Sequence, residues 1–335
     1  MLERLRALDP ADWPTGLSSA GSRAAWLAAL SCIGPDALAR SIPGTPPRAV
    51  LIIASGNVFT APVEWCVQLA HRGVRVLLKP ATGQESIAHA IATAIPGVEV
   101  RTWEGGDLAA EGLAMREADG ILGFGRAETL NAIGQRIPPG VRYLPFGPKF
   151  GISIVSAPGK ATVMDHVLYD GRGCMSPAAV FARTSDIDLL ATLLGELEGS
   201  LPRGPVTPEE AANLRARVTL ARAVGERRSA SNWCVLRLPP VQFWPIALPR
   251  LITVHPFNDV AEVAAAIGQY RVHLGTIATD LPGFDPVSVG LVHPALPPPR
   301  LCYPGEMQRP PADRLHDGVD VLAALWMSVR PTVTS

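Results

Sequence analysis

The first half of the chain alternates short apolar runs with segments of helical periodicity. Residues 49–54 (AVLIIA) form a fully apolar, β-branched run that ends at the turn residues Ser-Gly-Asn57, which predicts a buried parallel strand. A helical pattern follows over 61–72 and stops at Gly73. The same alternation predicts further strands over 74–78, 98–102, 120–122 and 152–155, and helices over 85–95 and 127–136. This order is typical of a doubly wound α/β domain.

The pattern restarts after Gly171 and predicts a second α/β unit. Residues 294–312 contain seven prolines, which exclude regular structure for most of that stretch because proline cannot donate a backbone hydrogen bond. The expected elements are strands over 174–184, 233–236 and 251–255, and helices over 186–197, 208–224 and 260–270.

The charge balance removes several classes of partner. The 335 residues contain 30 Lys+Arg and 30 Asp+Glu, and 47% are hydrophobic. A neutral, apolar chain is not disordered, and it offers no large basic surface for nucleic acid or acidic membranes. Only three of the basic residues are lysines (Lys79, Lys149, Lys160). Arginine serves as the general surface cation here, so a lysine inside a motif is informative.

Cysteine usage and the N-terminus indicate the compartment. The five cysteines are widely spread, with no spacing typical of a disulfide framework or a structural zinc site. The first residues have no apolar core typical of a signal peptide, and the apolar run over 49–54 is far shorter than the ~20 residues that span a bilayer. We therefore expect a cytoplasmic protein with no membrane span.

Cys174 is the most reactive candidate, because it stands in Gly171-Arg172-Gly-Cys174-Met-Ser-Pro177. The glycines leave the thiol accessible, and Pro177 is typical of the first turn of a helix. A cysteine just before a helix is expected to see the positive end of the helix dipole, which favours the thiolate. A buried structural cysteine is the alternative, and we expect it for the other four cysteines.

A partial nucleotide fingerprint follows the strand predicted over 120–122. Gly123-Phe-Gly125 supplies the first two glycines of G-x-G-x-x-G, but Glu128 replaces the third. Taken alone, the motif fits a structural turn equally well.

Five motifs in order resemble a known family. Ser-Gly-Asn57, Leu-Lys79-Pro-Ala, Gly-Phe-Gly, Gly-Pro-Lys149 and Gly-x-Gly-Cys174-x-Ser-Pro occur in the order of the aldehyde dehydrogenases. The segments SGNVFTAPVEW, LPFGPKFGISIV and GEMQRPPADRLHDG are similar to the fatty acyl-CoA reductases of the bacterial luminescence type. The resemblance implies an aldehyde dehydrogenase-like α/β fold with two doubly wound domains. We expect an N-terminal helical segment (1–44), an NADP-binding Rossmann-like domain (45–165), a catalytic domain (166–300), and a C-terminal proline-rich crossing with a helix (301–335).

The resemblance also implies roles for individual residues. Cys174 would attack a thioester to form an acyl-enzyme, and Asn57 would stabilise the oxyanion together with the Cys174 backbone N–H. Hydride from NADPH would then release an aldehyde. His316, in the family-like His-Asp-Gly, is a candidate proton donor, with a structural turn as the alternative. The residues expected at the cofactor are Lys79, Pro80, Thr82, Gly123, Gly125 and Gly147.

Three positions depart from the dehydrogenase pattern. Pro145 stands where a glutamate activates water, so hydrolysis of the acyl-enzyme is not expected. Thr82 replaces a glutamate that would repel a 2′-phosphate, which favours NADPH. Val241 stands where the glutamate of Glu-x-Phe-Gly-Pro binds the nicotinamide ribose, in the nearest match Val241-Gln-Phe-Trp-Pro245. His166 could assist Cys174 as a base, but a loop or surface histidine is the alternative.

The function expected from these residues is reduction of an acyl-CoA or acyl-carrier-protein thioester to an aldehyde with NADPH. Two alternatives stay open. One is a cysteine acyltransferase without hydride transfer, which the missing ribose glutamate would suit. The other is a non-catalytic relative that binds acyl carriers or a partner enzyme of a biosynthetic complex. The acyl group, the oligomeric state (a homo-oligomer is possible) and the pathway are left open by the sequence.

Overall fold

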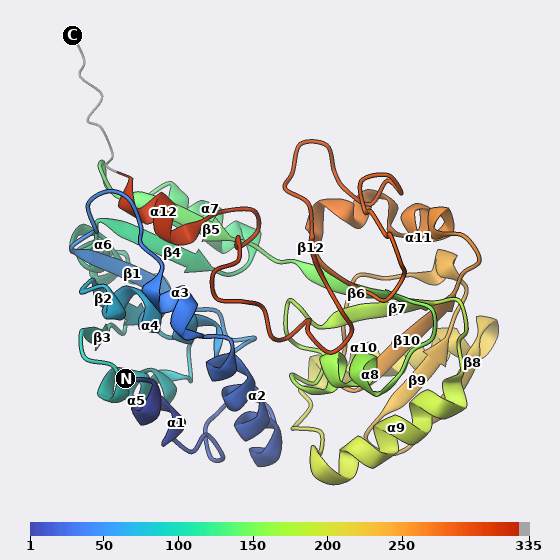
Figure 1. Cartoon of the computed structure of the whole chain (residues 1–335). Coiled ribbons are helices and arrows are strands. Elements are labelled where there is room, and N and C mark those ends of the chain that lie inside the picture. Colours follow the sequence, from blue (N-terminus) through green and yellow to red (C-terminus); the bar gives the residue numbers. More distant parts are fainter. Residues whose placement is uncertain (328–335) are drawn as a thin grey trace. The chain divides into compact units, whose positions relative to one another are not determined.

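The computed structural model describes residues 1–327 and divides into two compact units. The first unit consists of Met1–Thr15, Trp26–Pro148 and the chain from Pro311 onward; the second consists of Gly16–Ala25 and Lys149–Pro310. Each unit is an α/β structure built on one sheet (Figure 1). Within the segment expected over 301–335, residues 328–335 lie outside the described residues.

The described part of the first unit contains a five-stranded parallel sheet in the order β3-β2-β1-β4-β5. Its strands are β1 (Ala49–Ile53), β2 (Arg75–Lys79), β3 (Val98–Val100), β4 (Gly120–Phe124) and β5 (Arg142–Phe146). The helices are α1 (Leu2–Arg6), α2 (Ser19–Ser31), α3 (Pro35–Ala39), α4 (Ala61–His71), α5 (Glu85–Ala94), α6 (Leu108–Arg116), α7 (Ala127–Gly134) and α12 (Val321–Trp326), and the division between the units falls within α2.

Alternation along the strands sends side chains of the first sheet to two faces. On one face Leu51, Leu77 and Ile121 form a core with residues of α6 and α7. On the other face α12 approaches the strand so closely that a Cβ at Gly120 would lie 2.6 Å from Leu325 Cδ2. Glycine at this position therefore lets the C-terminal helix pack on the sheet.

The described part of the second unit contains a seven-stranded sheet in the order β12-β11-β6-β7-β10-β9-β8, in which only β8 is antiparallel to its neighbour. The strands are β6 (Phe150–Val155), β7 (Pro177–Ala182), β8 (Glu226–Ser229), β9 (Cys234–Arg237), β10 (Leu251–Pro256), β11 (Leu274–Thr279) and β12 (Arg300–Cys302). The helices are α8 (Lys160–Val167), α9 (Ile187–Ser200), α10 (Pro208–Val224) and α11 (Val260–Ile267), with 3₁₀ turns at η1 (Pro240–Gln242) and η2 (Gly268–His273).

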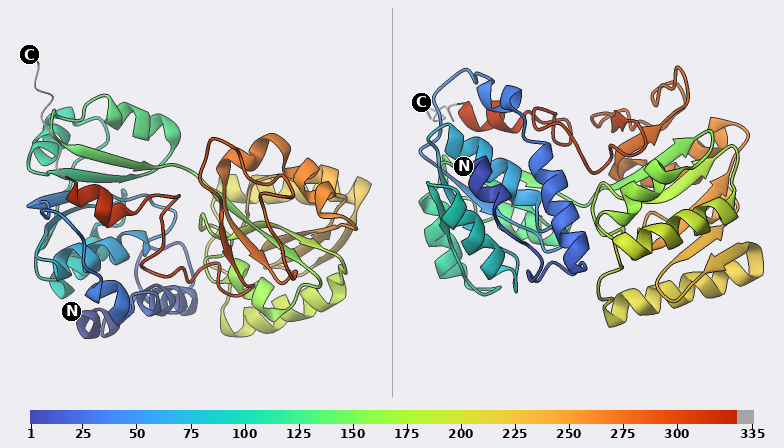
Figure 2. Two further views of the ribbon diagram at one scale, coloured as in Figure 1. Left: turned by 45° about the horizontal axis from the view of Figure 1, so that its top comes forward. Right: turned by 60° about the horizontal axis from the view of Figure 1, so that its bottom comes forward.

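Helices cover both faces of the second sheet, as Figure 2 shows. Ile252 and Val254 of β10 pack with α8 and α9, whereas Leu251 belongs to a cluster that includes residues of α10. Because neighbouring residues of a strand point to opposite faces, a continuous apolar run can line two cores at once. This explains why the central strands are apolar without alternation.

Most of the predicted elements are confirmed, and the α/β class is confirmed. The helix predicted over 208–224 coincides with α10, and the strand predicted over 49–54 is β1. Strands β5, β8, β11 and β12 and helices α6 and α8 were not predicted. The expected domain boundary at residue 165 differs from the observed division at Pro148, because β6 pairs with β7 and β11 of the second sheet.

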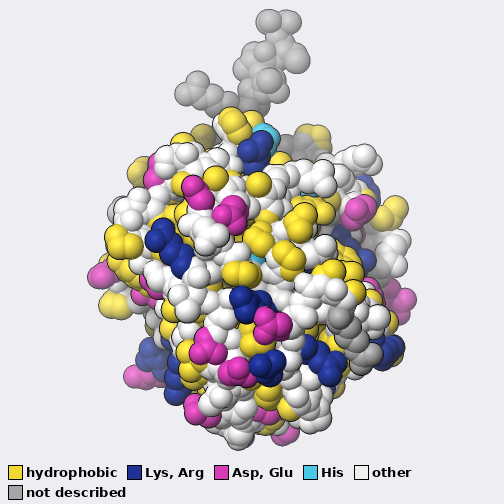
Figure 3. Space-filling view, turned by 90° about the vertical axis from the view of Figure 1, so that its right-hand side faces the viewer, with side chains coloured by type: hydrophobic (Ala, Val, Ile, Leu, Met, Phe, Trp, Pro, Cys, Tyr) yellow, Lys and Arg dark blue, Asp and Glu magenta, His cyan; other side chains and the backbone are white. Residues whose placement is uncertain are grey.

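Within residues 1–327 no helix has both the length and the apolarity needed to cross a bilayer. Basic and acidic side chains are interspersed on the face shown in Figure 3.

Candidate active site

The carboxyl ends of the first sheet's strands carry most of the residues expected at the cofactor. In a parallel sheet of this order, the crevice between β1 and β4 is the point where ligands bind. Asn57 is exposed in the bend that follows β1, and Lys79 is the last residue of β2. Gly123 lies in β4, and the exposed Gly147 follows β5. The structure therefore places these residues at one edge of one sheet.

The segment after β2 presents a cation and an open turn. Lys79 Nζ lies 5.6 Å from the centre of the Trp103 ring, within the range of a cation–π contact. Pro80 is buried, whereas Thr82 is exposed in the turn before α5. Lys79 and Thr82 are therefore accessible to a ligand at this edge, while Pro80 shapes the backbone.

The two glycines of the partial fingerprint have different reasons to be glycine. A Cβ at Gly123 would lie 3.0 Å from the Tyr143 ring and 3.1 Å from Leu130 Cδ2, so packing demands glycine there. A Cβ at Gly125 would meet nothing within 4 Å. Gly125 is followed by Arg126, the N-cap of α7. An open glycine with a cation before a helix N-terminus fits the pyrophosphate of a dinucleotide.

His316 packs into an aromatic cluster beside β4 and β5. Its ring centre lies 4.3 Å from that of Phe146, 5.8 Å from Phe124 and 5.7 Å from Trp65. Burial, with a smaller effect of Arg314, lowers the pKa of His316 to about 3. The structure thus brings His316 to the same edge as Gly125 and Gly147.

The contact between Arg314 and His316 selects the neutral imidazole. Arg314 Nη2 lies 3.3 Å from His316 Nδ1, and a guanidinium can only donate, so Nδ1 accepts. Arg314 Nη1 also pairs with Glu64 at 2.9 Å, which holds the guanidinium in place. A neutral imidazole is a weak acid, so the geometry favours a packing and positioning role for His316 over proton donation.

Cys174 lies in the second unit, on the loop between α8 and β7. The strand predicted over 174–184 is confirmed by β7, whereas the helix expected to follow Cys174 is wrong, because Pro177 begins β7 and pairs with Gly151. Proline fits the first residue of a strand, since its missing N–H is tolerated there. The accessibility of Cys174 therefore comes from its loop, and no helix dipole acts on the thiol from this side.

The five cysteines all lie in the described part of the chain, and among them only Cys174 is exposed. Burial raises the pKa of Cys66 to about 12 and the pKa values of Cys234 and Cys302 to about 11. These three thiols remain protonated near neutral pH, which suits the structural role expected for them. Cys174 is the accessible thiol.

A tight turn precedes Cys174. Asp170 and Gly171 have φ of 53° and 74°. A Cβ at Gly171 would lie 2.7 Å from His166 Cε1 and 2.8 Å from the Leu248 carbonyl oxygen, so only glycine fits. The surface location considered for His166 is wrong: the side chain is buried in α8, and burial lowers its pKa to about 4.

Buried ion pairs hold the amino side of the Cys174 loop. Asp170 Oδ1 accepts from Arg250 Nε at 2.5 Å, and both side chains are buried. Asp170 Oδ2 accepts from the Gly204 N–H at 2.8 Å. Arg172 binds both carboxylate oxygens of Glu210 on α10, at 2.7 and 3.0 Å. These contacts fix the loop two and four residues before Cys174.

A second polar cluster holds the carboxyl side of the loop. Gln308 Nε2 donates to Ser176 Oγ at 2.7 Å and to the Asp165 carbonyl at 2.9 Å. The Asp165 carboxylate accepts from the N–H groups of Gly305 and Met307, and burial raises its pKa to about 6. The segment Gly-Glu-Met-Gln308 therefore supports the loop that carries Cys174.

Sequence reasoning missed these supporting residues. Ser176 and Gln308 stand inside motifs singled out in the sequence, but the pattern gave no role for them. Asp165, Asp170 and Arg250 have no local signal, because their partners are distant in sequence. Asp170 and Arg250 are 80 residues apart, and Asp165 and Met307 are 142 residues apart. Polar residues that are fully buried need partners, and only the fold identifies them.

The departures from the dehydrogenase pattern have clear places. Pro145 lies exposed in β5, an edge strand, where proline is tolerated. It offers no group that could activate water. Val241, at the position of the ribose glutamate, lies exposed in the 3₁₀ turn η1 of the second unit. Within residues 1–327 no three His, Cys, Asp or Glu side chains are grouped as metal ligands.

Solved structures with a similar fold are aldehyde dehydrogenases. The NAD-dependent benzaldehyde dehydrogenase from Corynebacterium glutamicum matches with a TM-score of 0.62 and 13% identity, over 92% of this chain and 80% of that one. The NADP-dependent glyceraldehyde-3-phosphate dehydrogenase from Bacillus halodurans C-125, complexed with NADP, matches with a TM-score of 0.61 and 16% identity, over 90% of this chain and 77% of that one. The expected aldehyde dehydrogenase-like fold is confirmed.

Curated relatives match a part of the chain. The long-chain acyl-protein thioester reductase 2 of Photobacterium leiognathi is 29% identical over 170 residues, which are 47% of this chain and 36% of the relative. The corresponding reductase of Aliivibrio fischeri is 27% identical over 179 residues, 49% of this chain and 37% of the relative. The matched region thus spans little more than a third of each relative. The family model described as acyl-CoA reductase (LuxC) matches residues 39–328. The chain belongs to the acyl-CoA reductase (LuxC) family.

Proposed function

We propose that the protein reduces an acyl thioester to an aldehyde through an acyl-enzyme on Cys174, with NADPH as the reductant. The observation that carries the proposal is an exposed cysteine on a loop anchored from both sides by buried polar contacts. Membership of the acyl-CoA reductase family and the acyl-protein thioester reductase relatives support the reaction class.

In the first step the Cys174 thiolate attacks the thioester carbonyl carbon. A new carbon–sulfur bond forms at Cys174, the bond to the carrier sulfur breaks, and the carrier leaves as a thiol with the proton that Cys174 loses. Asn57 is proposed as the side-chain donor to the oxyanion, and the Cys174 backbone N–H as the second donor. The anchored loop favours this step, because a fixed nucleophile loses less entropy at the transition state.

In the second step the acyl-enzyme is reduced. A nicotinamide cofactor, when bound, supplies the hydride that the carbonyl carbon receives. The carbonyl oxygen would take up a proton from solvent to give a thiohemiacetal on Cys174, which would collapse to the aldehyde and return the thiol. Pro145 cannot activate water, which protects the acyl-enzyme from hydrolysis. Asn57, Lys79, Thr82, Gly125 and Gly147 are the residues proposed to bind the cofactor or to face it.

The phosphorylated cofactor is proposed from two features of the first unit. Lys79 supplies a positive charge at the end of β2, and the exposed Thr82 leaves the nearby turn without a carboxylate. A 2′-phosphate would gain from the cation and would meet no repulsion at Thr82.

The test combines intact-mass measurement with NADPH absorbance. The protein is mixed with a panel of short, long and aryl acyl-CoAs, with and without NADPH. We expect an acyl adduct in the wild type and in Cys302→Ala, none in Cys174→Ala, and loss of NADPH absorbance that requires Cys174. An acyl adduct without NADPH oxidation would indicate a cysteine acyltransferase instead of a reductase. The absence of both signals with every acyl group would refute the proposal.

A further inference from the structure

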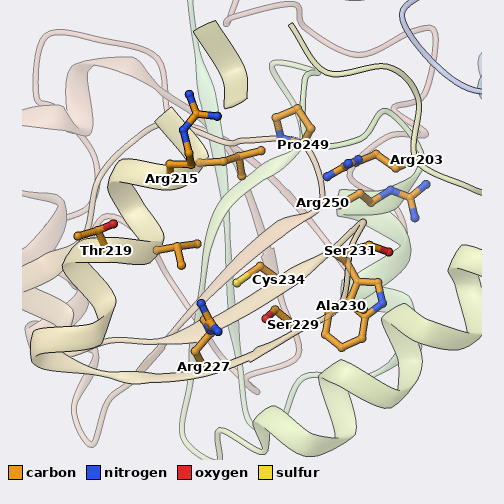
Figure 4. Close-up of a pocket in the computed structure, with 13 residues that line it drawn as sticks. Arg203, Arg215, Thr219, Arg227, Ser229, Ala230, Ser231, Cys234, Pro249 and Arg250 are labelled. Atoms are coloured by element: carbon orange, nitrogen blue, oxygen red, sulfur yellow. The ribbon is translucent and has the colours of Figure 1, made fainter. Parts of the chain in front are cut away.

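A cavity opens between α10, β8 and the starts of β9 and β10 in the second unit, with a volume of about 410 Å³ (Figure 4). Arg215 comes from α10, Arg227 and Ser229 from β8, and Cys234 lies between them in the close-up. Arg203 and Arg250 lie at one side. This arginine pocket is defined by Arg203, Arg215, Arg227 and Arg250, together with the apolar and hydroxyl side chains around them.

The lining of the arginine pocket carries four guanidinium groups and no carboxylate. Arg250 is neutralised by Asp170 and Glu198, which lie outside the lining. Among the described residues, the side chains of Arg203, Arg215 and Arg227 form no ion pair, although Arg203 Nη2 lies 3.5 Å from Asn232 Oδ1. Three cations are thus available to an anion in the cavity.

The other lining groups suit an organic phosphate. Hydroxyl groups from Thr219, Ser229 and Ser231 can donate to phosphate oxygens, and arginine forks match them in pairs. Apolar surface comes from Leu214, Val218, Trp233 and Pro249. A cavity of this volume is larger than a bare phosphate, so the apolar wall can hold the organic group attached to it.

The position of the arginine pocket relates it to Cys174. Strands β7, β10 and β9 are parallel neighbours in that order, so their amino ends lie at one edge of the sheet. The pocket lies at the starts of β9 and β10, and Cys174 stands three residues before β7. Neighbouring strands are about 4.8 Å apart, so β7 and β9 are separated by about 10 Å.

Arg250 also connects the arginine pocket directly to the loop that carries Cys174. It lines the pocket, and its Nε donates to Asp170, which begins the turn that leads to Cys174. A ligand with a phosphate in the pocket would therefore have its organic arm at the same sheet edge as the thiol.

We propose that the arginine pocket binds a phosphate group of the acyl donor, whose pantetheine arm carries the thioester towards Cys174. This inference rests on the proposed function. The shared ligand chemistry is a phosphorylated pantetheine, which occurs both in coenzyme A and on acyl-carrier proteins. The arginines would raise the affinity for the donor without taking part in the chemistry.

The test measures binding of three probes to the full chain by calorimetry: coenzyme A, phosphopantetheine and pantetheine. We expect Arg215→Gln and Arg227→Gln each to weaken binding of the phosphorylated probes by about tenfold, since a charge-assisted hydrogen bond is lost. Binding of pantetheine should not change. Arg228→Gln is the matched control, because Arg228 points to the opposite face of β8 and pairs with Asp188.

The outcomes distinguish recognition of phosphopantetheine from recognition of the coenzyme A nucleotide. They also distinguish the phosphate site from the proposed function. Arginine-dependent binding of phosphopantetheine equal to that of coenzyme A supports recognition of the shared arm, and dependence for coenzyme A alone supports recognition of its nucleotide phosphates. Unchanged coenzyme A and phosphopantetheine binding in both arginine variants would overturn the inference, even if the protein reduces acyl-CoA. Arginine-dependent binding without acylation of Cys174 would keep the phosphate site and refute the proposed function.

Discussion

Gln308 Nε2 donates a hydrogen bond of 2.7 Å to Ser176 Oγ, across 132 residues of sequence. Both side chains are buried. Since Ser176 is two residues from Cys174, this contact ties the Cys174 loop to the segment after β12. Gln308 and Ser176 are therefore structural supports of the Cys174 loop and not additional reactive groups.

Replacing Gln308 by leucine should loosen the Cys174 loop. The variant leaves Ser176 Oγ and the Asp165 carbonyl without their donor, which costs about 1–3 kcal/mol of stability. We expect kcat to fall at least tenfold with little change in KM, and the rate of Cys174 alkylation by iodoacetamide to change. Gln135→Leu, on an exposed site in the first unit, is the control. Equal kcat in both variants would remove Gln308 from the positioning role.

Replacing Gly171 by alanine should destabilise the second unit. The new Cβ would meet His166 and the Leu248 carbonyl oxygen at less than 3 Å in a backbone with φ of 74°. Gly97→Ala is a matched control, because Gly97 has φ of 89° and open space around it. Thermal denaturation should show a loss of about 1 kcal/mol for Gly97→Ala and a clearly larger loss for Gly171→Ala. Similar losses would mean that only backbone strain matters.

His316 should make the protein sensitive to acid. Its pKa is lowered from 6.5 to about 3 by burial, so the unfolded chain takes up a proton more readily than the folded one. The neutral, buried His316 therefore contributes to the free energy of unfolding above pH 6.5, and this contribution is lost as the pH falls towards 3. At pH 5 the loss is about 2 kcal/mol.

The variant that tests this is His316→Phe, which keeps the aromatic cluster and removes the titration. Its melting temperature should fall less than that of the wild type between pH 7.5 and pH 5. Activity should remain within a few-fold of the wild type, since packing is preserved. A loss of activity of a hundredfold or more, with unchanged stability, would instead support proton donation by His316.

A glutamate at position 82 should weaken NADPH binding. Thr82 is exposed in the turn that follows Lys79-Pro-Ala, and a carboxylate there would repel a 2′-phosphate. We expect KM for NADPH to rise about tenfold, equivalent to ~1.4 kcal/mol, with a smaller change for NADH. Thr93→Glu, on the exposed side of α5, controls for the added charge. An equal rise in KM for NADPH and for NADH would mean that the 2′-phosphate does not bind near position 82.

The sequence predicted the elements whose signals are local. The helix over 208–224 has a capping box in which Thr207 and Glu210 satisfy each other's backbone N–H, and such a signal is read from spacing alone. The short strands β8 and β12 lack an apolar pattern, because β8 is fully exposed and β12 is partly so. Whether such edge segments form strands depends on pairing with a neighbouring strand and not on the local sequence.

By itself the sequence determined the α/β class, which follows from periodicity. Residue types at short spacing singled out Cys174, and the family resemblance singled out Lys79 and the glycines that lie at one edge of the first sheet. Only the tertiary structure decided that a strand and not a helix follows Cys174, that His166 is buried, and that His316 is held neutral. It also brought Arg250 to Asp170 and Gln308 to Ser176. The physical reason is common to all of these: burial and hydrogen bonding depend on partners that are distant in sequence, and folding alone brings them together.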